Sequence, residues 1–371
     1  MNQLQKLEPT LFSAAQEVSR EPFGAVDAIN TAFDDRGVAI GDEVTVPIAP
    51  TRAAEDFVPA AAAATGTAAE ADDVKVRITK SRKVPFHLTG EQLRSLDNGA
   101  TSAEWIRQML AQGMRTLRNE AERDLVNEIK VGASRAAGAA GTSPFADDLN
   151  ALVDVRKILR DNGAPMSDMQ FVYDTSAEAA LLKLGVVQKA DQSGSPQERR
   201  TGILLPQFGF SMRASAGIEA HEAGTGADYV TDGATAQGVR TVGAKTGTGT
   251  ILPGDVVTMG GVKYVVNEAL ANGTFRIGRP GARNIIADES AIALSADYTP
   301  LLAFERGAVA GVMRPPVIPQ NPTISQVAIS DEFGMTYLLL DIAQYGQRTW
   351  ELHLAWGFRV VQGEHVAILQ A

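Results

Sequence analysis

The sequence between residues 101 and 131 contains one long helical pattern. Thr101 and Glu104 have the spacing of a capping box, and Gly132 follows the last apolar residue. At about 1.5 Å per residue the helix is roughly 45 Å long, so its single apolar stripe needs a long sheet or a second helix as a partner. The stripe repeats every three or four residues and consists of Ile106, Met109, Leu110, Met114, Leu117, Ala121, Leu125 and Ile129. The positions that we expect to face the partner are Ile106, Leu110, Leu117 and Leu125.

Two runs upstream of this helix alternate apolar and polar residues, which is typical of β-strands. The first run is 42–48, and the second is 74–88, which Pro85 interrupts. The alanine-rich tract 59–67 between them is predicted to be a loop tip. Residues 42–88 are therefore expected to form a long two-stranded ribbon. Because an isolated two-stranded ribbon is marginally stable in water, another surface must cover it.

Charges of opposite sign are distributed along the two strands of this expected ribbon. The basic residues lie on the second strand and are Lys75, Arg77, Lys80, Arg82 and Lys83. The acidic residues lie on the first strand and toward the tip, and include Asp42, Glu43, Asp72 and Asp73. Such charges are expected to set the register against the surface that covers the ribbon more than they add affinity. The alternative is a solvated charged hairpin.

Helical and strand-like segments alternate between the long helix and residue 218. Residues 133–146 are rich in Gly, Ala and Ser and are predicted to form a loop. The segments predicted after this loop are helices at 146–161 and 176–184 and strands at 169–173 and 208–218.

Residues 219–286 are rich in Gly, Thr and Val and have no helical period. Gly260 and Gly261 lie between two alternating valine runs, as in a two-residue hairpin turn. Short strands at this spacing favour a small closed β-module inserted into the main domain. The strands predicted in it are residues 239–242, 250–252, 255–259, 262–267 and 273–277.

The C-terminal part is predicted to be an antiparallel meander. Residues 300–313 before it fit either a helix or a strand, and Gly346 and Gly363 mark turns within it. The predicted strands are 326–329, 335–344, 348–361 and 365–369. The fold class is therefore α+β.

The composition excludes several classes of function. The chain has 371 residues, a formal net charge of −10 and no cysteine, so disulfides, thiolate metal sites and cysteine nucleophiles are excluded. An acidic total argues against a protein whose main task is to grip nucleic acid. No apolar run approaches the roughly 18 residues that span a bilayer, and the first residues lack a signal peptide's apolar region. We expect a cytoplasmic product without a membrane contact.

No catalytic constellation is found in the sequence. The four histidines, His87, His221, His353 and His365, have no metal-ligand spacing. The glycine-rich run 243–250 lacks the residue order of a phosphate-binding loop. Asp228 and Asp232 lie in a glycine-rich turn, where a weak cation site and a plain β-turn are the two interpretations. We therefore expect no catalytic, cofactor-binding or metal residues, and no enzyme.

The order of these parts resembles that of tailed-bacteriophage major capsid proteins with the Hong Kong phage capsid fold. The most family-like segment is GQRTWELHLAWGFRVVQGEHVAIL at 346–369, and the segment before the meander is FERGAVAGVMRPPV at 304–317. The insertion domain of short-tailed-phage coat proteins is similar to LPGDVVTMGGVKYVV at 252–266. In that comparison Gly254-Asp255 opens one strand and Gly261-Val262-Lys263 opens its partner.

The resemblance implies a domain plan for the whole chain. An extended loop, a spine helix with the meander beneath it in a peripheral domain, a mixed α/β axial domain and an inserted barrel-like β-domain follow an N-terminal arm. The implied boundaries are 1–41 for the arm, 42–88 for the extended loop, 89–145 with 318–371 for the peripheral domain, 146–218 with 287–317 for the axial domain and 219–286 for the insertion.

The resemblance also implies a function. It is that of a structural protein whose copies form the hexamers and pentamers of an icosahedral shell around a phage genome. The implied partners are copies of the chain, a portal protein and packaged double-stranded DNA in weak, non-specific contact. Because the ribbon begins near residue 42, we also expect a separate scaffolding protein rather than a long scaffolding segment in the chain. Assembly is expected in the host bacterial cytoplasm, with the product in the virion capsid.

Three other interpretations stay open from the sequence. An encapsulin-type cellular compartment has the same architecture and encloses proteins, and the inserted module favours the phage coat over it. A hydrolase or binding module with a β-rich accessory domain is a different class, which the lack of a catalytic constellation disfavours. A phage tail or decoration protein fits poorly with the long helix.

Overall fold

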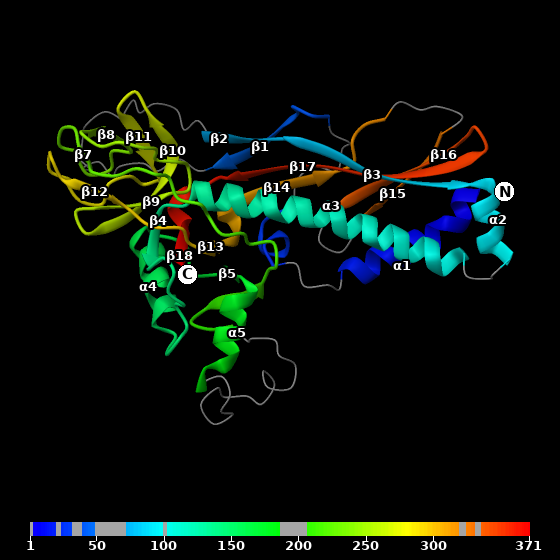
Figure 1. Ribbon diagram of the computed structural model, residues 1–371, viewed down its shortest axis with the longest axis horizontal. Helices are drawn as coiled ribbons and strands as arrows, with labels where there is room; N and C mark the ends of the chain where they lie inside the picture. The colour runs from blue at the N-terminus through cyan, green and yellow to red at the C-terminus, as the bar shows by residue number, and fades with distance from the viewer. Residues whose placement is uncertain are drawn as a thin grey trace, which may run out of the picture.

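The computed structural model describes residues 3–19, 24–31, 39–48, 72–98, 102–185, 206–318, 324–330 and 335–371. Figure 1 shows an elongated molecule in which one long helix runs beside a long sheet, with a β-rich body at one end. The helices are α1 (Gln3–Ser19), α2 (Gly90–Asn98), α3 (Ser102–Gly132), α4 (Asn150–Asp161) and α5 (Thr175–Lys183). The fold is mixed α and β, as predicted.

The long helix α3 covers one face of a five-stranded antiparallel sheet. Its Leu110, Leu117 and Leu125 are buried in the core that it shares with the sheet, and Ile106 is partly buried against the same core. Thr101 lies outside the described residues, so the capping box expected between Thr101 and Glu104 stays a prediction. On the sheet side the core is closed by Trp350, Leu352, Leu354 and Trp356 of one strand. The strands are β3 (Lys80–Thr89), β14 (Val309–Arg314), β15 (Ile324–Ser330), β16 (Thr336–Gln344) and β17 (Gln347–Val360).

The expected strand 74–88 is two strands in the structure. β2 (Asp72–Arg77) pairs with β1 (Glu43–Ile48) in a separate two-stranded sheet, whereas β3 joins the large sheet along β17. The ribbon prediction was therefore wrong for residues 80–88. The physical reason is that Phe86 packs against α3 at Gly113 and Leu88 is buried in the core, which a projecting ribbon would leave in water.

Gly357 of β17 makes this change of sheet possible. The chain leaves β2 by crossing closely over β17, and a Cβ at Gly357 would overlap the backbone carbonyl of Arg77. The Thr79 amide then donates to the Trp356 carbonyl at 3.1 Å, and β3 begins. The Gly357-Phe358 pair of the family-like segment thus has a steric cause at this crossing.

Replacing Gly357 by Ala is expected to lower the free energy of unfolding by about 2 kcal/mol, because backbone must move to admit the methyl group. Gly185 has open space around it and is the control, since Gly185→Ala should change stability by less than about 0.5 kcal/mol. Urea denaturation of both variants measures the difference. Equal stabilities would contradict the crossing described above.

The second large sheet combines a small α/β body with a closed barrel. The body strands are β4 (Arg135–Gly138), β5 (Met169–Tyr173), β6 (Phe210–Ala214), β13 (Pro300–Glu305) and β18 (Val366–Gln370). The helices α4 and α5 pack on them in one core with Phe171 and Leu301. Two expectations were wrong here: β4 falls in the predicted loop 133–146, and α4 begins at Asn150 rather than at 146.

The last strand, β18 (Val366–Gln370), does not belong to the C-terminal meander, contrary to the prediction. It pairs with β13 and β4 in the second sheet and not with the strands of the meander. The segment 300–313 is likewise divided, because β13 and β14 lie in different sheets on either side of a 3₁₀ turn at Arg306–Ala308. Val366, Ile368 and Leu369 are fully buried between the body and α3 or α4, which decides where this last strand packs.

Six strands close into a barrel at one end of the molecule (Figure 1). The hairpin prediction at Gly260 and Gly261 is confirmed: both have positive φ and they connect Met259 to Val262. The predicted strand at 250–252 is wrong, and β12 lies beyond residue 286. In ring order the strands are β11 (Thr274–Ile277), β8 (Thr241–Lys245), β7 (Tyr229–Thr231), β12 (Ala291–Leu294), β9 (Val256–Met259) and β10 (Val262–Ala271), which pairs again with β11.

Candidate inter-subunit surface

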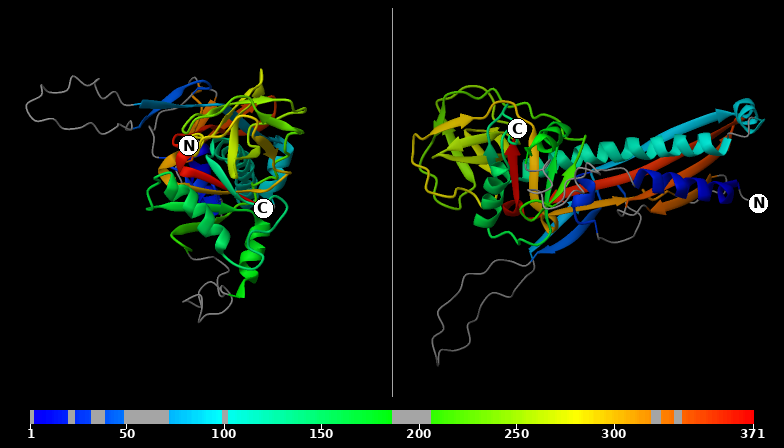
Figure 2. Two further views of the ribbon diagram at one scale, coloured as in Figure 1. Left: turned by 90° about the vertical axis from the view of Figure 1, so that its left-hand side faces the viewer. Right: turned by 90° about the horizontal axis from the view of Figure 1, so that it is seen from below.

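The two-stranded ribbon of β1 and β2 projects from the body in both views of Figure 2. One of its faces is apolar, because Val44 lies opposite Val76 and Val46 lies opposite Val74. Val76 is fully buried against the body, whereas the other three valines are only partly buried. The apolar face is therefore fully covered only at Val76, and its other three valines are covered in part. The body side of this contact consists of Ala310, Val312, Ala355 and Val361.

The other face of the ribbon is charged and solvated. Lys75 Nζ lies 2.9 Å from Glu43 Oε2, and both side chains are well exposed. Asp42 accepts a hydrogen bond from the Ala39 amide at 2.7 Å, and Arg77 is exposed. The side chains of Asp72 and Asp73 in β2 lie outside the described residues. On this face Lys75 and Glu43 pair within the chain, and the apolar face is the surface that needs a cover.

The other three basic residues expected on the ribbon lie on β3 instead. Lys80 Nζ lies 2.8 Å from Asp124 Oδ1 of α3, and Arg82 Nε donates to Glu120 Oε1 at 2.9 Å. These pairs join the strand to the helix rather than to the ribbon. Lys83 extends from the other face of the strand.

Lys83 belongs to a small polar cluster on the outer face of the sheet. Its Nζ donates to Glu351 Oε1 at 2.8 Å, and His353 Nε2 lies 3.1 Å from Glu351 Oε2. Burial raises the pKa of the Glu351 carboxyl, but the hydrogen bonds from Lys83 and His353 outweigh it and bring the pKa below its ordinary value. Burial lowers the pKa of His353 despite the nearby carboxylate. The cluster therefore holds a carboxylate beside a neutral imidazole at neutral pH.

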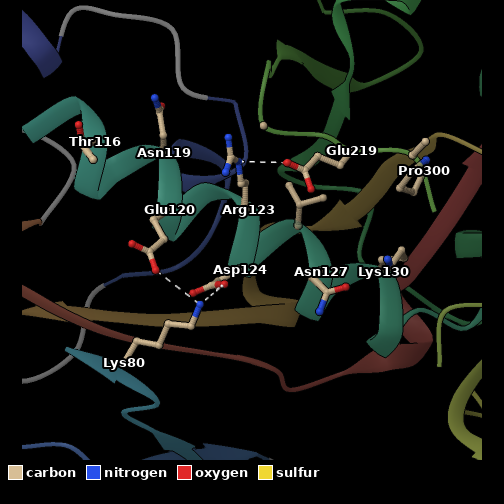
Figure 3. Close-up of a pocket in the computed structure, with 13 residues that line it drawn as sticks. Lys80, Thr116, Asn119, Glu120, Arg123, Asp124, Asn127, Lys130, Glu219 and Pro300 are labelled. Carbon is tan, nitrogen blue, oxygen red and sulfur yellow. Dashed lines mark hydrogen bonds and ion pairs between the residues drawn. The ribbon is translucent and has the colours of Figure 1, made fainter. Parts of the chain in front are cut away.

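A groove of about 680 Å³ follows the polar side of α3 (Figure 3). Asp124 lies on one wall, where it also accepts a hydrogen bond from Trp356 Nε1 at 2.8 Å. Arg123 and Glu219 form a pair at 3.2 Å across the groove, and both are largely exposed. The lining contains both signs of charge together with the amides of Asn119 and Asn127, so it has no net preference for a cation or an anion.

Two charged residues of α3 are buried and hold the N-terminal segment. Glu122 accepts hydrogen bonds from the amides of Ala25 at 2.7 Å and Val26 at 2.9 Å, and from Ser215 Oγ at 2.7 Å. Arg118 Nη2 lies 2.7 Å from Asp27 Oδ1. The sequence pattern did not single these out. The available signal was that both charges border the apolar stripe, next to Leu117 and Ala121, where a solvated charge is out of place.

Replacing Glu122 by Ala is expected to destabilise the protein by about 3 kcal/mol, because two buried amides lose their acceptor. Amide hydrogen exchange at Ala25 and Val26 should rise together with the fall in stability. Glu122→Gln keeps one acceptor oxygen and should recover part of the loss, and Asn119→Ala on the exposed side should change neither quantity. Unchanged protection of the two amides in Glu122→Ala would contradict the assignment.

A buried polar joint connects α3 to the barrel. Asp255 accepts from the amides of Leu252 and Gly224 and lies 2.8 Å from His221 Nε2, while Lys130 Nζ lies 3.2 Å from His221 Nδ1. Burial lowers the pKa of Lys130, although Asp255 and Glu219 act in the opposite sense. With the ammonium donating to Nδ1, the imidazole donates through Nε2 to the carboxylate. These contacts hold His221 and Asp255, which precedes β9 of the barrel, against the C-terminal end of α3.

The turn with Asp228 and Asp232 was one candidate for a weak cation site. Asp232 follows β7 and lies 3.7 Å from the ammonium of Lys245, while Asp228 precedes the strand. Among the described residues there is no group of three or more His, Cys, Asp or Glu side chains that could hold a metal ion. Likewise, none of the helices in the described ranges is long and apolar enough to cross a membrane.

Comparisons with known proteins found solved structures that align with most of this chain. No known protein family matches the sequence, and no curated protein matches it either. A structure titled as the capsid of the cyanophage P-SCSP1u aligns with 93% of this chain and 89% of its own at 13% identity and a TM-score of 0.48. A structure of a virus-like particle from Pyrococcus furiosus aligns with 98% of this chain and 99% of its own at 10% identity and a TM-score of 0.48. A chain of Mycobacterium phage Che8 aligns with 92% of this chain and 94% of its own at 12% identity and a TM-score of 0.44.

Proposed function

We propose that this chain is a structural, non-catalytic subunit that assembles with copies of itself into a closed shell, as a major capsid protein of a tailed phage. The observation that carries the proposal is the incompletely covered apolar face of the ribbon. Val76 at the base is buried, whereas Val44, Val46 and Val74 are only partly covered by the body of the same chain. A two-stranded ribbon whose apolar face is incompletely covered is marginal in water, and a neighbouring copy supplies the missing cover.

We propose a ring of copies rather than a symmetric pair. The ribbon leaves the body at one side, and the surface that it is proposed to cover lies elsewhere on the next copy. Such a contact is head-to-tail, and it closes into a ring when the rotation between copies allows it. Hexamers and pentamers of this kind build an icosahedral shell. Glu43, Lys75 and Arg77 lie on the opposite face of the ribbon, where Lys75 and Glu43 pair within the chain, and we propose that this face stays in solvent, as in the alternative of a solvated charged hairpin.

The finer domain plan is also part of the proposal. α3 takes the role of the spine helix of the Hong Kong phage capsid fold, and β14 to β17 with β3 form its peripheral domain. The body around β5 and β13 takes the role of the axial domain, and the closed barrel takes that of the insertion. β12 moves the end of this insertion from 286 to about 294. A scaffolding protein, a portal protein, packaged double-stranded DNA, and assembly in a bacterial cytoplasm remain predictions.

Sedimentation velocity and negative-stain microscopy of the purified chain test the proposal. The chain is expected to form capsomer-sized rings or closed shells, alone or after addition of a scaffolding protein. A monomer that persists at about 100 µM under both conditions would refute it. Shells that contain protein and no nucleic acid when made during phage infection would favour the encapsulin-type compartment. Substrate turnover by a monomer would favour the hydrolase.

A further inference from the structure

Four arginines gather where the barrel meets the end of α3. They line a pocket of about 300 Å³ between β10 and β11 on one side and β17 with α3 on the other. In the same pocket Glu268 lies 2.7 Å from Arg276 Nη1, and Glu128 lies 3.5 Å from Arg359 Nη1. The arginines of this pocket, which we call the arginine pocket, are Arg240, Arg276, Arg279 and Arg359.

The positive charge of the arginine pocket exceeds what its own carboxylates neutralise. Four guanidinium groups face the two carboxylates of Glu128 and Glu268 among the lining residues. Arg276 Nε is buried and has no acceptor within the described part of the chain. The pKa of Arg240 is lowered by burial and then by the nearby charges of Arg276 and Arg279. The pocket is thus a preformed place for carboxylate oxygens, with mixed charge at its rim.

The opposite side of the barrel carries the complementary charge. In the ring order of the strands, β7 and β12 lie across from β10 and β11, and Figure 1 places them at the outer end of the molecule. Asp232 follows β7, and Asp288 and Glu289 precede β12. All three carboxylates are more than half exposed and lie within 3.7 Å of the ammonium of Lys245. We call this set the acidic face.

We infer that neighbouring copies also meet barrel to barrel, with the acidic face of one copy in the arginine pocket of the next. The inference rests on the proposed self-assembly, because it needs copies side by side. Carboxylate and guanidinium groups form the strong, two-pronged hydrogen bonds that such a contact requires. The two surfaces lie on opposite sides of one barrel, so the contact is head-to-tail and has the symmetry of the proposed rings.

The distribution of charge within each surface favours a protein partner over a nucleic acid. A phosphate chain offers negative charge alone, and it would meet Glu128 and Glu268 in the pocket with repulsion. The acidic face instead has a cation, Lys245, among its carboxylates, just as the pocket has carboxylates among its arginines. Mixed surfaces of this kind can match in detail, and they penalise partners of a single charge sign.

A charge swap tests the contact. Arg279 and Glu289 are both exposed, so Arg279→Glu and Glu289→Arg should each fold normally while placing like charges opposite each other. Each variant is expected to raise the concentration for half-maximal assembly at least tenfold, measured by sedimentation velocity at low salt. The chain that carries both changes restores opposite charges between copies and should return to within about threefold of the original.

Matched reversals on the exposed helix α2, Arg94→Glu and Glu91→Arg, are the controls and should leave assembly unchanged. Circular dichroism of all variants checks the fold. Assembly of both single variants at the original concentration would overturn this contact but leave the proposed shell intact. Failure of the double variant to recover, or an Arg279→Glu chain that assembles normally and loses only DNA binding, would also overturn it. An original chain that never assembles would refute the proposed function itself.

Discussion

Replacing Leu117 by Asp is expected to abolish soluble, folded protein. Leu117 is buried at the middle of α3, in the core that this helix shares with Leu352 and Leu354 of β17. A carboxylate at that position loses its hydration and finds no cation in the surrounding apolar core. The cost is expected to exceed about 4 kcal/mol, which is a large part of the roughly 5–15 kcal/mol that stabilises a typical folded domain. Soluble yield and urea denaturation measure the effect.

The neighbouring residue provides the control for this prediction. Thr116 is exposed on the groove side of the same helix turn, so Thr116→Asp adds the same charge one residue away and should alter stability by less than about 0.5 kcal/mol. Leu117→Met keeps the volume and should cost less than about 1.5 kcal/mol. Normal expression of Leu117→Asp would show that this face of α3 does not pack as described.

Replacing Val46 by Asp is expected to leave a folded chain that no longer assembles. Val46 lies on the apolar face of the ribbon, beyond the part that the body of the same chain fully buries. A carboxylate there costs less in the isolated subunit, where the side chain is only partly buried, than against a neighbouring copy, where burying it costs several kcal/mol. Because each 1.4 kcal/mol is about a tenfold change in affinity, the concentration for half-maximal assembly should rise at least about 100-fold. Sedimentation velocity measures that concentration.

Thr45→Asp is the matched control, because Thr45 lies next to Val46 on the charged face of the ribbon. It is expected to assemble within about threefold of the original chain. Both variants should still show a cooperative thermal unfolding transition, since neither position is part of the main core. Equal assembly of Val46→Asp and Thr45→Asp would remove the apolar face of the ribbon from the contact between copies.

Patterns that are local in the sequence predicted the structure best. The extent of α3 follows from its apolar period, and β5 coincides with its predicted residues 169–173. The turn at Gly260 and Gly261 follows from the need for positive φ between two alternating runs. In each case the deciding interactions lie within a few residues, so the sequence window contains them.

Partners that are distant in the sequence decided the rest. Residues 74–88 read as one alternating strand, but Gly357, nearly 280 residues later, admits the crossing that divides it into β2 and β3. β18 follows the strands of the meander in the sequence, yet it pairs with β13 and β4, because it is buried there in the body. Alternation predicts that a strand has an apolar face and not which sheet will cover it.

The sequence is equally unable to predict the partners of the charged residues near the candidate surface. Lys80 and Arg82 read like the other basic residues of the ribbon, and only the fold shows that α3 supplies Glu120 and Asp124 as their partners. Arg118 and Glu122 read as helix surface, and their partners come from the N-terminal segment. A single sequence lists the charges and does not state which of them meet within the chain and which are left for another copy.

Photo-cross-linking from the ribbon tests the central claim most directly. A photoreactive amino acid replaces Val46, and equal amounts of isotopically light and heavy chains are mixed, assembled and irradiated. Cover by a neighbouring copy predicts cross-linked peptides in which light and heavy chains are joined at the statistical ratio. Cross-links confined to light–light and heavy–heavy pairs, from Val46 back to its own body, would contradict it.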